Sequence, residues 1–177
     1  QGLARVLRDN GITPTCRVAV LAENNPVFVS AVLAVSLVGA VFVPLNTRWR
    51  ICEMERALED AKCVALIYSP KFAGMVQDIQ ADGYAPPLLV GEGAKLPGGC
   101  RSWADYAQQA EPDEGFTVGY PRPDAPGAIL FTGGTTGKAK GALLSHASFV
   151  LDAVADSRDQ LLYGPGSVFF SVAPLAH

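Results

Sequence analysis

The chain has 177 residues, of which 49% are hydrophobic and 18% are charged, and its 14 basic and 17 acidic side chains give a net charge of −3. The charged fraction is below the ~25% typical of soluble domains, which excludes disorder for most of the chain. It predicts a large core, or an apolar surface that packs on other protein. No basic excess is available for sequence-blind binding of nucleic acid, so we expect no nucleic-acid partner.

Helix and strand patterns alternate along the first part of the chain. Short apolar runs predict strands, and capped or amphipathic segments predict helices. The predicted elements are helices at 3–10, 26–38, 52–61, 71–80 and 102–110, and strands at 17–22, 40–45, 63–68 and 87–91. Strand, helix, strand at this spacing forms right-handed βαβ units. The predicted fold class is therefore α/β, with a parallel sheet and flanking helices.

One uncharged segment has to be tested as a membrane span. Val27–Val43 falls just short of the ~18–20 apolar residues that cross a bilayer. Asn25 and Pro26 before it are typical of a helix N-cap and first turn, and Gly39 is typical of a helix end. We interpret the segment as a buried helix followed by a strand, and we expect no transmembrane segment.

The cysteines are scattered and the histidines are few. No Cys-x-x-Cys pair occurs, and only two histidines could complement the thiols, so a zinc cluster is not supported and no metal ligand is assigned. The chain opens without a signal-peptide pattern. The cysteines are expected to be buried thiols in a reducing cytoplasm; they are Cys16, Cys52, Cys63 and Cys100.

A proline-rich stretch offers the one subdomain boundary that we expect. Glu111–Pro126 holds four prolines and is interpreted as a surface crossing without regular structure. It separates residues 1–110, a first α/β portion, from residues 127–177. This second portion of the same domain carries the segment on which the functional interpretation depends.

That segment is a strand at 128–132 followed by a glycine- and threonine-rich loop at 133–141. Glycines let backbone N–H groups converge on an anion, threonines add hydroxyl donors, and Lys138 and Lys140 bring positive charge. The carboxyl end of a strand is also where open α/β sheets place their ligands. The loop therefore predicts a polyphosphate site.

Other phosphate motifs fail at specific positions. The Walker A pattern fails because Thr132 stands at its first glycine and Ala139 stands where a magnesium-binding hydroxyl is required, which argues against a P-loop hydrolase. The Rossmann glycine pattern also fails at Thr132. The sequence contains no serine-hydrolase elbow and no zincin motif. A surface hairpin without a ligand is the alternative that the residues leave open.

Residues 131–142, FTGGTTGKAKGA, resemble the signature [YF]-T-[SG]-G-T-T-G-x-P-K-G-[AV] of AMP-forming acyl-CoA synthetases and related adenylating enzymes. The LLSH at 143–146 and the APLAH at 173–177 resemble two further motifs of that superfamily. Ala139 departs from the signature, where proline is usual. The resemblance covers essentially the whole chain. It implies an internal piece of the large N-terminal domain, because the superfamily's remaining motifs would follow His177.

The resemblance implies an acid–thiol ligase that uses ATP with Mg²⁺, a small-molecule carboxylic acid and coenzyme A. It assigns His177 to the acyl pocket as a catalytic residue, although a strand-end histidine bonded to a backbone carbonyl is an alternative. His146 is expected to order a helix at 147–162 rather than to catalyse, and Lys138 to point to solvent. The implied phosphate ligands are Thr132, Gly133, Gly134, Thr135, Thr136, Gly137 and Lys140.

Several functional alternatives stay open at the level of sequence. The isolated chain could be a non-catalytic nucleotide- or phosphate-binding module, or the acceptor could be a carrier-protein thiol. Fatty, aryl and small dicarboxylic acids are all compatible with the motifs. A homodimer is compatible with the sequence as well.

Overall fold

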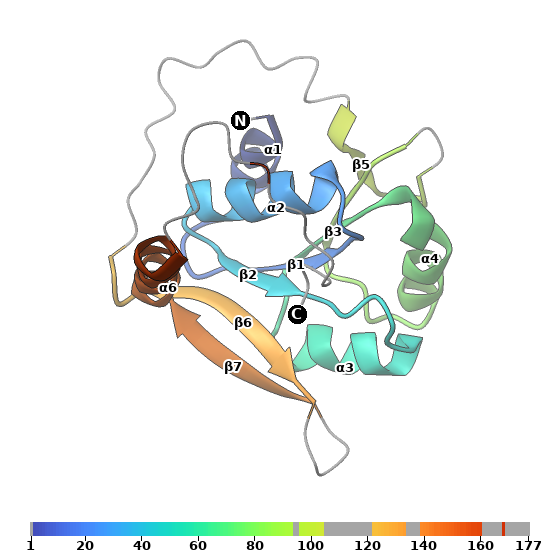
Figure 1. Cartoon of the computed structure of the whole chain (residues 1–177). Coiled ribbons are helices and arrows are strands. Elements are labelled where there is room, and N and C mark those ends of the chain that lie inside the picture. The colour runs from blue at the N-terminus through green and yellow to red at the C-terminus, as the bar shows by residue number, and fades with distance from the viewer. Residues whose placement is uncertain (1, 94–95, 105–121, 134–138, 161–167, 169–177) are drawn as a thin grey trace.

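A computed structural model gives the fold as a twisted sheet with helices on both faces (Figure 1). It describes residues 2–93, 96–104, 122–133, 139–160 and 168.

The described strands form one sheet of seven, in the order β5-β4-β3-β1-β2-β6-β7. Neighbouring strands are parallel except for β6 and β7, which are antiparallel. The strands are β1 (Arg17–Leu21), β2 (Val41–Pro44), β3 (Ala65–Tyr68), β4 (Leu88–Gly91), β5 (Arg101–Ser102), β6 (Pro126–Thr132) and β7 (Lys140–Ser145). The predicted α/β class is confirmed, and the last strand makes the sheet mixed rather than wholly parallel.

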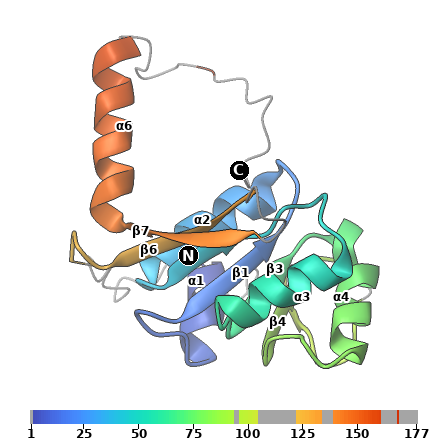
Figure 2. The same cartoon turned by 90° about the horizontal axis from the view of Figure 1, so that it is seen from below.

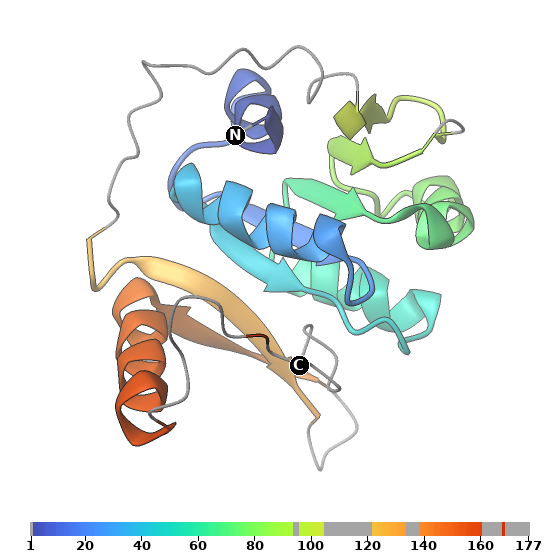
Figure 3. The same cartoon turned by 45° about the horizontal axis from the view of Figure 1, so that its top comes forward.

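Helices α1 (Gly2–Asp9) and α2 (Pro26–Leu37) cover one face of the sheet (Figure 3). The Asn25 side chain accepts a hydrogen bond from the Phe28 N–H at 3.1 Å, so it caps α2 as predicted. Gly39 has a φ of 72°, which is the left-handed conformation expected just after a helix. The uncharged segment is therefore helix then strand. Among the described residues, no helix is long and apolar enough to cross a membrane.

Helices α3 (Ile51–Asp60) and α4 (Ala73–Ala81), with the 3₁₀ turn η1 (Pro70–Phe72), cover the opposite face (Figure 2). An apolar stripe that the sequence of this segment shows at helical spacing is buried against the sheet. It consists of Met54, Ala57, Leu58 and Ala61. A 3.6-residue period places such residues on one side of a helix, which is why the pattern predicted the buried face correctly.

The chain after β6 turns back as β7 and then enters α6 (His146–Gln160), which projects away from the sheet (Figure 2). Strand β7 was not predicted from sequence. Its first four residues are exposed, so the strand has no alternation of buried and exposed positions to mark it. Its backbone pairing with β6 holds it in place instead.

Two further expectations need correction. Ser102 lies at the end of β5, a two-residue strand, rather than at the start of a helix; residues 103–104 are helical, and residues 105–110 lie outside the described part. The cysteines are free, but Cys52 is exposed and the other three are only partly buried. Residues 111–121 also lie outside the described part, so the boundary at 111–126 stays a prediction.

Candidate functional site

The predicted phosphate loop connects β6 to β7. Strand β6 is parallel to β2 and ends at Thr132, so the loop starts at the carboxyl edge of the parallel part of the sheet, where α/β folds bind ligands. Thr132 and Lys140 are opposite each other in the antiparallel pair. The two ends of the loop are therefore adjacent, and residues at both ends can act on one ligand.

The structure places three of the predicted phosphate ligands. Thr132, Gly133 and Lys140 are all exposed at the loop end of the hairpin. The Thr132 hydroxyl donates a hydrogen bond to the Lys140 carbonyl at 3.4 Å. The other four predicted ligands lie outside the described residues; they are Gly134, Thr135, Thr136 and Gly137. His177 and Lys138 also lie outside them.

The exposed groups at the loop ends suit an anion. A lysine ammonium is a compact positive charge with three donors, and a threonine hydroxyl can donate one hydrogen bond. A Cβ added at Gly133 would meet no atom within 4 Å, so the backbone there is open to an approaching group. Antiparallel pairing of the flanking strands makes the segment a hairpin, and a hairpin loop can also hold an anion. The surface-hairpin interpretation therefore does not exclude the phosphate site.

Gly141 is required by a close approach inside the hairpin. It lies opposite Phe131, and a Cβ added at Gly141 would come within 2.8 Å of Ile129 Cγ2 and 3.5 Å of Phe131 Cε1. A contact below 3.0 Å forces neighbouring atoms to move. Gly141 belongs to the loop motif in the sequence, and the close approach to Ile129 gives a steric reason for a glycine at this position.

On the α3 side, the hairpin packs against the connection between β2 and α3. The rings of Trp49 and Phe131 meet edge to face, with centroids 5.7 Å apart and an interplanar angle of 77°. Both side chains are partly buried, and both line a cavity of about 250 Å³ that Arg56 of α3 and Ala139 also border. Nothing in the sequence pairs Trp49 with Phe131, so this contact could not be predicted from the sequence.

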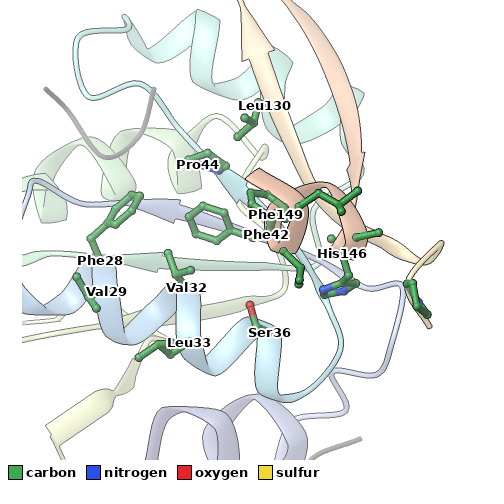
Figure 4. Close-up of a pocket in the computed structure, with 15 residues that line it drawn as sticks. Phe28, Val29, Val32, Leu33, Ser36, Phe42, Pro44, Leu130, His146 and Phe149 are labelled. Atoms are coloured by element: carbon green, nitrogen blue, oxygen red, sulfur yellow. The ribbon is translucent and has the colours of Figure 1, made fainter. Parts of the chain in front are cut away.

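On the other face of the sheet, an apolar groove of about 870 Å³ runs between α2, β2, β6 and α6. Figure 4 shows side chains of α2, including Val32 and Leu33, across the groove from Phe149 of α6. Leu33 is 59% exposed, although α2 is apolar on all sides, and helices of that kind are normally buried. This groove is the kind of apolar surface that the low charge content predicted.

His146 lies at the junction between the hairpin and α6. Its backbone N–H donates to the Ala125 carbonyl at 3.0 Å, and its Nε2 is buried without a hydrogen-bond partner among the described residues. The adjacent Ser145 hydroxyl accepts from the Ser148 N–H at 3.3 Å, in the manner of a helix N-cap. The start of α6 is thus capped by Ser145, while His146 links it to the segment before β6.

The described residues include no group of three or more His, Cys, Asp or Glu side chains that could hold a metal ion.

Comparison with known proteins gives the family. A family model described as "AMP-binding enzyme" matches residues 1–177. The chain belongs to the AMP-binding enzyme family.

Curated relatives of this AMP-binding chain include CoA ligases. It is 34% identical over 152 residues to a feruloyl-CoA synthase of an Amycolatopsis species, covering 86% of this chain and 28% of the relative. It is 33% identical over 154 residues to the indoleacetate–CoA ligase of Aromatoleum aromaticum, and this match covers 86% of this chain and 29% of the relative. The chain therefore spans less than a third of the length of these two relatives.

Solved structures agree with the fold. The ATP-bound MatB from Rhodopseudomonas palustris matches with a TM-score of 0.80 and 29% identity, covering 99% of this chain and 33% of that one. The acetoacetyl-CoA synthetase of Streptomyces lividans shares the fold, with a TM-score of 0.87 and 22% identity. The match covers 99% of this chain and 29% of the synthetase. The mixed sheet with flanking helices is thus the arrangement found in part of these larger enzymes.

Proposed function

We propose that the protein containing this chain is an AMP-forming acid–thiol ligase. The observation that carries the proposal is that Thr132, Gly133 and Lys140 lie together at the carboxyl end of β6. The chain that holds them is matched by the family model of AMP-binding enzymes. Phosphoryl transfer depends mainly on the positioning of the phosphate groups and the neutralisation of their charge. Exposed donors at the two ends of one loop can provide both effects. The other four loop residues, Gly134, Thr135, Thr136 and Gly137, are proposed to complete the phosphate cradle.

The proposed reaction has two steps. A carboxylate oxygen of the acid attacks the α-phosphorus of ATP; a P–O bond forms, the bond to the β-phosphate oxygen breaks, and pyrophosphate leaves with the electron pair. The product is an acyl-AMP. The sulfur of a thiol then attacks the acyl carbon while the thiol proton passes to solvent; a C–S bond forms, the bond from the acyl carbon to the phosphate oxygen breaks, and AMP leaves with the electron pair, which gives a thioester. Magnesium is proposed to arrive with the nucleotide, and His177 to border the acyl group.

Coenzyme A is the proposed thiol, supported by relatives that are named as CoA ligases. A carrier-protein thiol is the second candidate, because the matches also include a fatty acid–[acyl-carrier-protein] ligase of Streptomyces coeruleorubidus at 30% identity and tyrocidine synthase 3 of Brevibacillus parabrevis at 28%. We propose a cytoplasmic location, which suits the four free thiols.

Exchange of radiolabelled pyrophosphate into ATP, with a panel of carboxylic acids, tests the first step on the full-length protein. We expect Lys140→Ala to lower exchange by about 10- to 100-fold, since hydrogen bonds to charged groups are worth roughly 1.5–3 kcal/mol. Lys62→Ala is the matched control, because Lys62 follows α3 and lies outside the loop. Wild-type exchange in Lys140→Ala would refute the phosphate assignment.

A second assay separates the thiols. The acyl-AMP formed by the intact protein is offered coenzyme A or a phosphopantetheinylated carrier protein, and thioester formation is followed by mass spectrometry. Transfer to coenzyme A supports the proposal, and transfer to the carrier alone supports the second candidate. We expect the isolated 177-residue chain to show no exchange of pyrophosphate into ATP. Measurable exchange by this chain alone would contradict that expectation.

A further inference from the structure

The loop end of the hairpin is attached to the rest of the sheet through side chains. The pairing of β2 with β6 places Phe42 opposite Ala128, four residues before Thr132. Beyond that point Ile129 and Phe131 pack against the core cluster on the α3 side. The position of the loop end thus depends on what these side chains touch.

Phe131 is the side chain nearest the loop in this attachment. It directly precedes Thr132, and its partner across the hairpin is Gly141, next to Lys140. A Cβ added at Gly141 would lie 3.5 Å from the Phe131 ring, at ordinary van der Waals distance, and only 2.8 Å from Ile129 Cγ2, so the two strands lie close together here. The edge-to-face contact with Trp49 at 5.7 Å then fixes the ring on its other side.

Trp49 is itself held by a hydrogen-bonded turn. Its backbone N–H donates to the Asn46 carbonyl at 3.0 Å, and the Arg48 N–H donates to the Asn46 side-chain oxygen at 2.9 Å. The Arg50 N–H donates to Glu53 Oε2 at 2.8 Å, which joins the turn to the first turn of α3. The indole is therefore presented from a hydrogen-bonded connection between β2 and α3.

We propose that Trp49 is a positioning residue for the phosphate loop, acting through Phe131 on the backbone that presents Thr132 and Lys140. This inference rests on the proposed function and extends it, because it assigns to the β2–α3 connection a role in ATP binding. Trp49 acts through the Phe131 ring and sets the position of the strand end that carries these two residues.

Steady-state kinetics of the full-length protein test the proposal. Trp49→Leu keeps an apolar side chain but removes the aromatic edge contact, and we expect it to raise KM for ATP by about 3- to 10-fold, the range that aromatic pair energies imply, with KM for the acid unchanged. Trp49→Phe keeps an aromatic ring and should recover KM for ATP to within about 2-fold. An unchanged KM for ATP in Trp49→Leu would overturn the proposal.

Trp103→Leu is the matched control. Trp103 follows β5 at the opposite edge of the sheet and packs on the other core cluster, so its loss removes a similar side chain far from the hairpin. We expect it to lower thermal stability without raising KM for ATP. Equal effects of Trp49→Leu and Trp103→Leu on KM for ATP would show a general structural effect and would overturn the proposal.

A measurement without turnover separates this inference from the proposed function. The full-length protein is labelled with 5-fluorotryptophan, and the ¹⁹F resonance that disappears in Trp49→Phe is assigned to Trp49. Magnesium pyrophosphate should shift this resonance and leave that of Trp103 in place. Calorimetry under the same conditions reports binding: absence of binding would contradict the proposed function, whereas binding with an unshifted Trp49 resonance would overturn only the role of Trp49.

Discussion

Thr132 and Lys140 are opposite each other at the end of the β6–β7 pair, and the Thr132 hydroxyl donates to the Lys140 carbonyl at 3.4 Å. This relationship brings together two residues that are eight positions apart in the chain and that the loop motif assigns to one ligand. Side-chain donors from both ends of the loop can thus reach the same anion.

Replacing Thr132 by valine should weaken ATP use. Valine has nearly the same volume but no hydroxyl, so the single hydrogen bond that Thr132 donates is lost, whether it goes to the Lys140 carbonyl or, with nucleotide bound, to a phosphate oxygen. We expect KM for ATP to rise by about 5- to 10-fold in the full-length protein, as measured by pyrophosphate exchange. Thr132→Ser keeps the hydroxyl and should stay within about 2-fold of wild type. Equal KM values for the valine and serine variants would contradict a role for the hydroxyl.

Replacing Gly141 by alanine should destabilise the hairpin. The new methyl group would lie 2.8 Å from Ile129 Cγ2, so we expect a loss of about 1–3 kcal/mol in the free energy of unfolding measured with urea. Gly74→Ala is the control: Gly74 lies in α4 with no atom within 4 Å of the added Cβ, so alanine should stabilise by about 0.5–1 kcal/mol. A neutral Gly141→Ala would show that the close approach is not present in solution.

Cys63 should resist alkylation where Cys52 reacts. Burial raises the pKa of the Cys63 thiol to about 12, and the nearby Arg17 charge only partly opposes this effect. The thiolate is the nucleophile, so at pH 8 iodoacetamide should modify Cys63 at least about 100-fold more slowly than the exposed Cys52, as followed by peptide mass spectrometry. Similar rates at the two residues would contradict the buried environment.

The same raised pKa makes stability fall at alkaline pH. Between the ordinary thiol value of 9.0 and about 12, the unfolded thiol loses its proton while the folded thiol keeps it, so the unfolded state is favoured as the pH rises. The loss approaches about 1.4 kcal/mol per pH unit for one proton. Urea midpoints measured from pH 8.5 upward should fall less steeply in Cys63→Ala than in wild type; parallel slopes would argue against a contribution from Cys63.

The apolar groove between α2 and α6 should bind a hydrophobic dye in the isolated chain. Leu33 is 59% exposed there, and contiguous apolar patches of this kind attract such ligands. Leu33→Glu should therefore reduce anilinonaphthalene sulfonate fluorescence by about half or more and raise solubility. Gln77→Glu adds the same charge at an exposed site on α4 and should leave the fluorescence unchanged.

The sequence alone determined the local elements and the chemistry of the loop. The cap at Asn25, the helix end at Gly39 and the stripe around Met54 depend on residues close together in the chain, so their patterns were readable without a fold. The residues around Thr132 likewise carry a recognisable phosphate-loop pattern, and a family model matches the chain that contains them.

The tertiary structure decided which distant segments meet. Strand β7 is exposed along its first four residues and shows no alternation, so its pairing with β6 depends on a backbone ladder that leaves no mark in the side-chain pattern. Strand β5 has two residues, so it is too short to show an alternation of apolar and polar side chains in the sequence. The contact between Trp49 and Phe131 joins the connection after β2 to the end of β6, and the sheet order makes these two strands neighbours. Local patterns fix what each segment becomes, whereas such contacts arise only when strands and helices are packed against one another.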